Sequence, residues 1–445
     1  MARALIERLA AWCWETLRRI PAGSRHTLIA NLVQQACAAA LLFSIPNLLS
    51  KEAFAETVFV GVLMLAVGLA DLGLSSVYGR VVPRLLAAGD ADGIRQWDAM
   101  VVGFGSAGAM LFGAAITSIY FSRYDDPLHA AMIFPVPLLT FWASFHASRA
   151  SVRGNFSDYR RFIVMRATAG LIAIPATWWL GVSGWFLTQL IAAIIVTARI
   201  GPHLRKPWGR LDGHLFRAHI REALLLALAG VAVLQLLSFA RVYASIDYPE
   251  DTLAVYGVAG AAYQALAALV LSLFMPVTID LMSRFAGAPS APFERATVIL
   301  RHTALLTTAG AMVAAEIAPY VLNAAFPSYT FDRRLVFALV IGIAFFPFFI
   351  CWGNCLIGVR RTGTYLGVIA TSIGLAALLA AQVDRAIPLL GAAVGQGLTL
   401  ALYPALLLLP ILALCPNARG PLRGGIRLYA LVLALVAAHA WIRWI

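Results

Sequence analysis

The sequence predicts an all-α polytopic membrane protein in which about twelve transmembrane helices form two six-helix bundles around a central cavity. Hydrophobic residues make up 61% of the 445-residue chain, charged residues only 12%, and the mean hydropathy is +0.83. A helix that crosses a hydrocarbon core of about 30 Å needs roughly 20 apolar residues, and segments of that length recur along the chain. The composition therefore indicates a protein whose partner is the lipid bilayer.

Twelve segments, and a thirteenth candidate at the C-terminus, meet this length requirement. We expect spans at 27–49, 54–79, 99–121, 128–148, 162–181, 184–200, 222–244, 253–282, 298–323, 334–358, 363–381 and 387–414, with an extra hydrophobic helix at 426–445. Segment 253–282 is long enough that we expect it to tilt, kink or include an interfacial turn.

The positions of the basic residues predict the orientation. Most of the 34 Lys and Arg residues fall in loops on one side of the membrane, whereas the opposite loop SIDYPEDT at 245–252 is acidic. Because short cytoplasmic loops retain basic residues, this pattern predicts a cytoplasmic N-terminus. The net charge of +13 is spread along loops between spans, so we expect no nucleic-acid partner.

The spans divide into two equal groups. We expect an amphipathic interfacial helix at 1–24, an N-terminal bundle at 25–201, a basic cytoplasmic connector at 202–221, a C-terminal bundle at 222–415 and the extra helix at 416–445. The segment AFAETVFVGVLML after the first span weakly repeats as DTLAVYGVAGAAY after the seventh. Six spans in each half permit a pseudo-two-fold axis along the membrane normal, as in transporters built from repeats.

Asp71 is the deepest charge that the sequence places. It lies about nine residues before Arg80, or roughly 13 Å into the membrane at 1.5 Å per residue. An ionisable group at that depth usually faces a polar cavity or a partner. Three roles stay open: coupling to a proton or cation, orientation of an arginine, or hydrogen bonds to Asn31, Gln34 or Gln35 of the first span.

A cationic face is expected at the end of the fourth span. His146, Arg149 and Arg153 follow i, i+3, i+7 spacing in FHASRASVRGNF, which places them on one side of a helix. Arginine binds phosphate through a planar fork of donors, so this face is a candidate substrate-binding site. The alternative is that these residues contact lipid phosphates as ordinary residues of the inner surface.

Other polar residues within the spans are weaker candidates. Arg166 and Arg241 lie near the expected ends of their spans, where they can snorkel to the interface. Arg241, Gln34 and Gln35 are added to the candidate substrate-binding residues. Further intramembrane amides line a sugar path or bond neighbouring helices, namely Gln235, Gln264, Asn354 and Gln396.

Three stretches resemble a known family: DLGLSSVYGRVVPRL, PEDTLAVYGVAGAAYQ and AEIAPYVLNAAFPSYT. They are similar to the polysaccharide-exporter branch of the multidrug/oligosaccharidyl-lipid/polysaccharide exporter superfamily, over roughly residues 27–414. Members commonly carry an Asp-Arg pair near the end of the seventh span, where this chain has Ala240 before Arg241. The resemblance implies a bacterial inner-membrane flippase that moves an undecaprenyl-pyrophosphate-linked oligosaccharide by alternating access, with a polysaccharide polymerase as a possible partner.

Two other function classes stay open. One is a multidrug or other lipid exporter of the same superfamily. The other is a membrane-embedded glycosyltransferase or polymerase, since Asp90 and Asp92 form a nominal DxD pattern; a solvated turn is the alternative for that pair. The five cysteines predict neither a disulfide framework nor a metal site, and we expect no cofactor.

Overall fold

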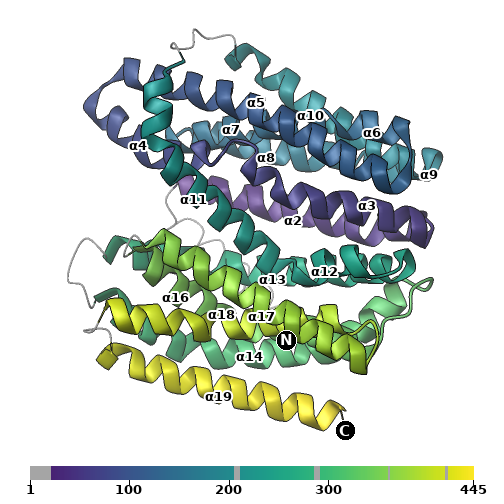
Figure 1. The fold of residues 1–445 in the computed structure, drawn as a ribbon. Helices are drawn as coiled ribbons and strands as arrows, with labels where there is room; N and C mark the ends of the chain where they lie inside the picture. Colours follow the sequence, from purple (N-terminus) through teal and green to yellow (C-terminus); the bar gives the residue numbers. More distant parts are fainter. Residues whose placement is uncertain (1–21, 205–210, 285–290, 359–360, 416–418, 445) are drawn as a thin grey trace, which may run out of the picture. The chain divides into compact units, whose positions relative to one another are not determined.

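The computed structural model describes residues 22–204, 211–284, 291–358, 361–415 and 419–444, and these ranges consist of helices joined by short turns and loops, with no strand (Figure 1). The expected amphipathic helix at 1–24 lies almost entirely outside the described residues. The helices are α2 (Ala22–Leu48), α3 (Lys51–Met64), η1 (Leu65–Leu69), α4 (Leu74–Ala88), α5 (Ala91–Tyr124), α6 (Pro127–Ile133), α7 (Val136–Val152), α8 (Phe156–Gly170), α9 (Ala173–Leu180), α10 (Val182–Leu204), α11 (Gly213–Leu237), α12 (Phe239–Asp247), α13 (Glu250–Arg284), α14 (Ala291–Ala325), α15 (Arg333–Ile341), η2 (Gly342–Phe345), α16 (Phe346–Gly358), α17 (Thr362–Ala386), α18 (Gly391–Leu414) and α19 (Arg419–Trp444).

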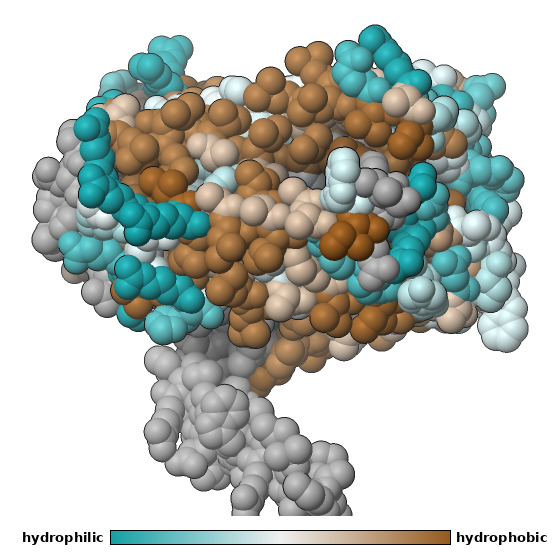
Figure 2. All heavy atoms as spheres, turned by 90° about the horizontal axis from the view of Figure 1, so that it is seen from below, coloured by the Kyte–Doolittle hydropathy of each residue, from teal (hydrophilic) through white to brown (hydrophobic). Residues whose placement is uncertain are grey.

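Thirteen helical segments in the described ranges are long and apolar enough to cross a membrane. This confirms the predicted polytopic all-α class, including the C-terminal segment, which forms the continuous helix α19. The face of the molecule in Figure 2 is broadly apolar, with polar side chains gathered toward its edges. Large apolar side chains such as Leu306, Leu378 and Leu409 are exposed, as expected where hydrocarbon replaces water.

The helices pack into two compact units. Unit 1 contains residues 1–44 and 69–223, and unit 2 contains residues 45–68 and 224–445. The second span, α3 with η1, therefore packs with helices from the second half of the chain. Helix α11 begins at Gly213, within the segment expected to be the connector. The ranges 25–201 and 222–415 stay a prediction for the two bundles.

The two echoed sequence segments pack against each other inside unit 2. They fall in α3 and α13, which are in extensive contact. Gly257 of α13 makes this close approach possible, because a Cβ at that position would overlap Val58 and press on Phe54 of α3. The absence of a side chain at Gly257 therefore sets the distance between the two helices.

The seventh span is broken, which the hydropathy pattern did not reveal. It consists of α11 and α12, separated at Ser238. The buried side chain of Gln396 in α18 bridges the break: its Nε2 donates to the Leu236 carbonyl at 2.9 Å, and its Oε1 accepts from the Ala240 amide at 3.1 Å. Gln264 of α13 donates to the Ser238 hydroxyl at 2.6 Å. Both amides therefore bond neighbouring helices, which was one of the two expected roles.

Helix α19 is fastened to unit 2 by polar contacts at both ends. It lies beside α14 (Figure 1). Near its beginning the Thr297 hydroxyl of α14 donates to the Pro421 carbonyl at 2.7 Å. Near its end the His439 ring lies 3.0 Å from the Glu316 carboxylate of α14, which also pairs with Arg333. These bonds explain why the extra hydrophobic helix has a defined place in the fold.

The Gln396 bridge yields a stability prediction. Replacing Gln396 with Leu removes the partners of two backbone groups in a buried region, so we expect the unfolding free energy to fall by about 1–3 kcal/mol. A thermal unfolding curve of the purified protein in detergent measures the change. Gln382→Leu, at an exposed position of α17, is the matched control and should leave the transition within about 0.5 kcal/mol of the wild type. Equal midpoints for the two variants would contradict a structural role for the bridge.

Candidate functional site

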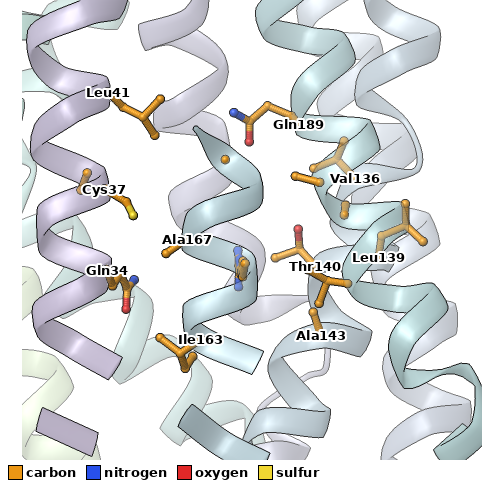
Figure 3. Close-up of a pocket in the computed structure, with 16 residues that line it drawn as sticks. Gln34, Cys37, Leu41, Val136, Leu139, Thr140, Ala143, Ile163, Ala167 and Gln189 are labelled. Carbon is orange, nitrogen blue, oxygen red and sulfur yellow. The ribbon is translucent and has the colours of Figure 1, made fainter. Parts of the chain in front are cut away.

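Unit 1 contains a cavity of about 320 Å³ within the membrane-spanning region, bounded by α2, α7, α8 and α10. Its polar lining consists of Gln34 of α2, Thr140 of α7, Arg166 of α8 and Gln189 of α10. The other lining residues are small or apolar, and none of the sixteen is Asp or Glu. Figure 3 shows the labelled Gln34, Thr140 and Gln189 around this space. We call it the amide cavity.

Arg166 lies in the third turn of α8. It is ten residues from the beginning of this helix at Phe156, or about 15 Å along the helix axis, and five residues after Arg161. The side chain is exposed to the amide cavity, and its Nη1 donates a long hydrogen bond of 3.4 Å to the Ser144 hydroxyl of α7. The first turns of α8 carry Asp158, Arg160 and Arg161, so the expectation that Arg166 snorkels to the interface stays a prediction.

A second charged group in unit 1 was missed by the sequence analysis. Asp98 of α5 is buried, and its carboxylate accepts from the Tyr78 hydroxyl of α4 at 2.7 Å. It also pairs with Arg149 of α7 at 2.8 Å and with Arg153, directly after α7, at 2.6 Å. The carboxylate therefore joins three helices. We call the end of unit 1 where α5 and α8 begin and α7 ends the basic end.

The three residues of the expected cationic face have different surroundings in the structure. Arg149 and Arg153 meet at Asp98 and share its carboxylate. His146 is buried, and its ring packs edge-on against Phe162 of α8 with centroids 4.2 Å apart. The spacing in the sequence correctly placed these residues on one side of α7. It did not reveal that a carboxylate of α5 lies opposite them.

Asp71 does not lie inside a continuous helix. The second span ends in η1, and Asp71 occupies the turn before α4, where Leu72 and Gly73 adopt positive φ values of 54° and 76°. The carboxylate accepts from the Gly73 amide at 2.9 Å and from the Ser75 amide at 3.0 Å. It therefore caps the N-terminus of α4, a role not among the three left open.

The turn at Asp71 is also held from α5. A Cβ at Gly108 would collide with the Ala70 carbonyl oxygen, so only glycine at this position lets the turn approach α5 so closely. The observed partners of Asp71 are the two amides of its own turn, rather than an arginine or the amides of Asn31, Gln34 and Gln35. Coupling through this residue stays a prediction.

The other candidates lie apart from the amide cavity. Gln35 is exposed and is not among the lining residues, unlike its neighbour Gln34. Arg241 belongs to α12 in unit 2, where its side chain packs on Gly260 of α13 and its buried Nε has no hydrogen-bond partner among the described residues. The sequence thus identified one lining residue of the cavity, Gln34, and missed Gln189.

The DxD pattern has ordinary local partners. Asp90 is the N-cap of α5 and accepts from the Gly93 amide at 2.8 Å, while Asp92 pairs with Arg95 one turn later. Both carboxylates are exposed. This arrangement is the solvated turn that the sequence analysis gave as the alternative to a nucleotide-sugar site.

The Asp98 cluster yields the second prediction. Asp98→Ala leaves two arginines without their shared acid in a buried setting, so we expect the unfolding free energy to fall by about 3–5 kcal/mol. Asp92→Ala on the same helix breaks only the exposed pair with Arg95 and should cost no more than about 0.5 kcal/mol. Thermal unfolding in detergent compares the two variants. A small effect of Asp98→Ala would show that the cluster does not hold the three helices together.

The Asp71 cap yields the third prediction. The Gly73 and Ser75 amides donate to different oxygens of Asp71, and asparagine keeps only one acceptor oxygen, so Asp71→Asn should lose one bond and lower the unfolding free energy by about 0.5 kcal/mol. Asp71→Ala removes both acceptors and should lower the unfolding free energy by about 1 kcal/mol. The same unfolding measurement tests both variants, and equal destabilisation by Asn and Ala would mean that the negative charge, and not the cap, is the stabilising feature.

The comparisons with known proteins place the fold. No family model and no curated protein matches the sequence. Among solved structures, a mutant of the Vibrio cholerae MATE transporter VcmN is similar at a TM-score of 0.60 and 15% identity, covering 92% of this chain and 97% of the other. The lipid II flippase MurJ in an inward closed conformation is similar at 0.64 and 13% identity, covering 94% and 97%.

An inward-facing multidrug resistance MATE transporter of the MOP superfamily is similar at a TM-score of 0.58 and 14% identity, covering 91% of this chain and 94% of the other. Identities this low concern the fold alone. The chain is thus a multi-pass membrane protein with the two-bundle transporter fold seen in MATE proteins and in MurJ.

Proposed function

We propose that the protein is a flippase that moves an undecaprenyl-pyrophosphate-linked oligosaccharide repeat unit across the bacterial inner membrane, for O-antigen or exopolysaccharide biosynthesis. One observation carries the proposal: Arg166 lies within a membrane span and faces a cavity lined by amides and a hydroxyl but by no acid. An arginine within a membrane span that has no acidic partner among the described residues is costly, which favours an anionic ligand as its partner.

The chemistry of the amide cavity suits such a headgroup. A guanidinium presents up to five N–H donors in a plane and binds phosphate oxygens through two of them at once. The side-chain amides of Gln34 and Gln189 both donate and accept, as sugar hydroxyls require. The isoprenoid tail needs no protein site, because the bilayer itself is its solvent.

Residues of the basic end are candidates for the first contact with the headgroup. Arg149 and Arg153 share the Asp98 carboxylate, and Arg153 is the more exposed of the two. We include them with His146, Gln35 and Arg241 as proposed substrate contacts that rank below Arg166 and Gln34. The basic residues favour a cytoplasmic location for this end, which gives the N-terminus the same side.

Energy and partners complete the proposal. An ion gradient or the membrane potential drives alternating access, and Asp71 is the candidate coupling residue. Coupling at Asp71 requires its titratable proton, so a folded Asp71→Asn protein with normal flux across a range of pH would exclude it.

A polysaccharide polymerase, which consumes the flipped repeat unit, is the proposed protein partner. The neighbour MurJ is named as the flippase of another lipid-linked molecule, lipid II.

The charge of the cavity weighs against the two alternatives. An exporter of cationic drugs needs acidic or aromatic groups for its substrates, whereas the amide cavity presents an arginine. A glycosyltransferase with a DxD metal site needs free carboxylates, whereas Asp90 caps α5 and Asp92 pairs with Arg95. An exporter of another anionic lipid stays the nearest competitor.

Flux in proteoliposomes tests the proposal. With a fluorescent polyprenyl-pyrophosphate oligosaccharide and an imposed ion gradient, we expect flux above empty vesicles for the wild type. Arg166→Gln should lower it at least about tenfold, since a hydrogen bond to a charged group contributes about 1.5–3 kcal/mol. Arg161→Gln, an exposed position on the same helix, is the matched control and should transport normally. Absence of wild-type flux with any repeat unit would refute the proposed substrate.

A further inference from the structure

A second cavity of about 260 Å³ adjoins the amide cavity in unit 1. The two share Ala143, Ile163, Arg166 and Val196, so Arg166 lies where they meet. The second cavity extends toward the basic end, where Ser148 and Tyr159 line it within about one turn of the end of α7 and the beginning of α8. We call it the hydroxyl cavity.

Hydroxyl groups follow one side of α7 along both cavities. Thr140, Ser144 and Ser148 are spaced i, i+4, i+8, which places them on the same side of the helix over about 12 Å. Thr140 lines the amide cavity, and the two serines line the hydroxyl cavity. Tyr159 of α8 adds a phenolic hydroxyl to the latter.

Arg166 retains hydrogen-bonding capacity toward this series. Its bond to the Ser144 hydroxyl is long, at 3.4 Å, and involves one of five possible donors. None of the nine residues lining the hydroxyl cavity is acidic. Among the described residues, the guanidinium therefore borders two adjoining spaces that are lined by neutral polar and apolar side chains and by no acid.

We propose that the hydroxyl cavity is a saccharide subsite, in which Ser144, Ser148 and Tyr159 hydrogen-bond the sugar attached to a pyrophosphate held by Arg166. This inference rests on the proposed function. In the substrate class the first sugar is bonded directly to the pyrophosphate, and the hydroxyl cavity directly adjoins Arg166. Hydroxyls that both donate and accept match the ring hydroxyls of a sugar in either role.

The size of the cavity limits what it holds. Ligand pockets usually measure about 300–1,000 Å³, so a space of 260 Å³ is small for a whole repeat unit and suits the first sugar. Small side chains at Ala143 and Ala147 keep the cavity open along α7, and both residues are themselves buried. We therefore expect the subsite to bind the sugar next to the pyrophosphate and not the rest of the oligosaccharide.

Binding of two related probes to the purified full chain tests the inference. The probes are citronellyl pyrophosphate and the same compound carrying one N-acetylhexosamine. We expect the wild type to bind the glycosylated probe more tightly. The variant Ser148→Ala, which leaves the Ser144 hydroxyl that bonds Arg166 in place, should weaken binding of the glycosylated probe about three- to tenfold, the effect of one lost hydrogen bond, and leave the bare probe unchanged. Tyr159→Phe, which keeps the ring, should act in the same direction.

Two controls separate the possible outcomes. Ser118→Ala removes a hydroxyl on α5 that bonds only its own helix carbonyl, and it should change neither affinity. Arg166→Gln should weaken both probes. Unchanged affinity of the serine variant for the glycosylated probe, or equal losses for both probes, would overturn the subsite while the proposed function stands. A wild type that binds neither probe would overturn both.

Discussion

The structure depends on one constraint: in a hydrocarbon solvent a buried polar group is costly unless it finds a partner within the protein. Three side chains supply such partners, two of them where a helix is interrupted and one where charged side chains of neighbouring helices come together. Gln396 bonds the backbone on both sides of the break after α11, and Asp71 bonds two amides at the beginning of α4. Asp98 accepts from a tyrosine and pairs with two arginines. Each of them satisfies groups that would otherwise destabilise the membrane-embedded fold.

Arg166 differs from these three side chains, as does Arg241, whose buried Nε has no hydrogen-bond partner among the described residues. Arg166 is informative because it lines two cavities. Its one hydrogen bond within the described ranges is long, and the two cavities that it faces contain no acid. Arg149 and Arg153 belong to the same unit and are also arginines, yet they share a buried carboxylate. The contrast separates a charge that stabilises helix packing from one that is available to a ligand. Position in the sequence alone does not make this distinction.

Hydropathy predicted the spans well and their interruptions poorly. A twenty-residue apolar window has the same mean whether the backbone is continuous or broken, so the breaks at 70–73 and at Ser238 left no signal in it. The group that satisfies the second break, Gln396, is more than 150 residues away. Asp71 carried a local signal, because Asp followed by Leu-Gly is typical of a turn and a helix cap.

The candidate site was partly predictable for a related reason. Gln34 was identified because an amide in an apolar segment is conspicuous, while the sequence gave no sign that Arg166 lines the same cavity. Asp98 was placed just outside an expected span, at 99–121, and so was not considered as a partner for Arg149. Spacing along α7 gave the side of the helix correctly, but only tertiary packing reveals which charge lies opposite.

The sign of a buried charge limits function more narrowly than the fold does. MATE transporters and MurJ share this architecture with the chain at 13–15% identity, so the architecture alone does not distinguish a drug from a lipid-linked headgroup. A cavity around an arginine repels cations and binds anions through bidentate hydrogen bonds. Rejection of one ligand class and attraction of the other both contribute to specificity. The amides and hydroxyls next to that charge are neutral groups that can hydrogen-bond sugar hydroxyls. A phosphorylated sugar needs such partners, whereas a simple anion does not. The combination at Arg166 therefore argues for a glycosylated anionic lipid more strongly than any likeness of fold.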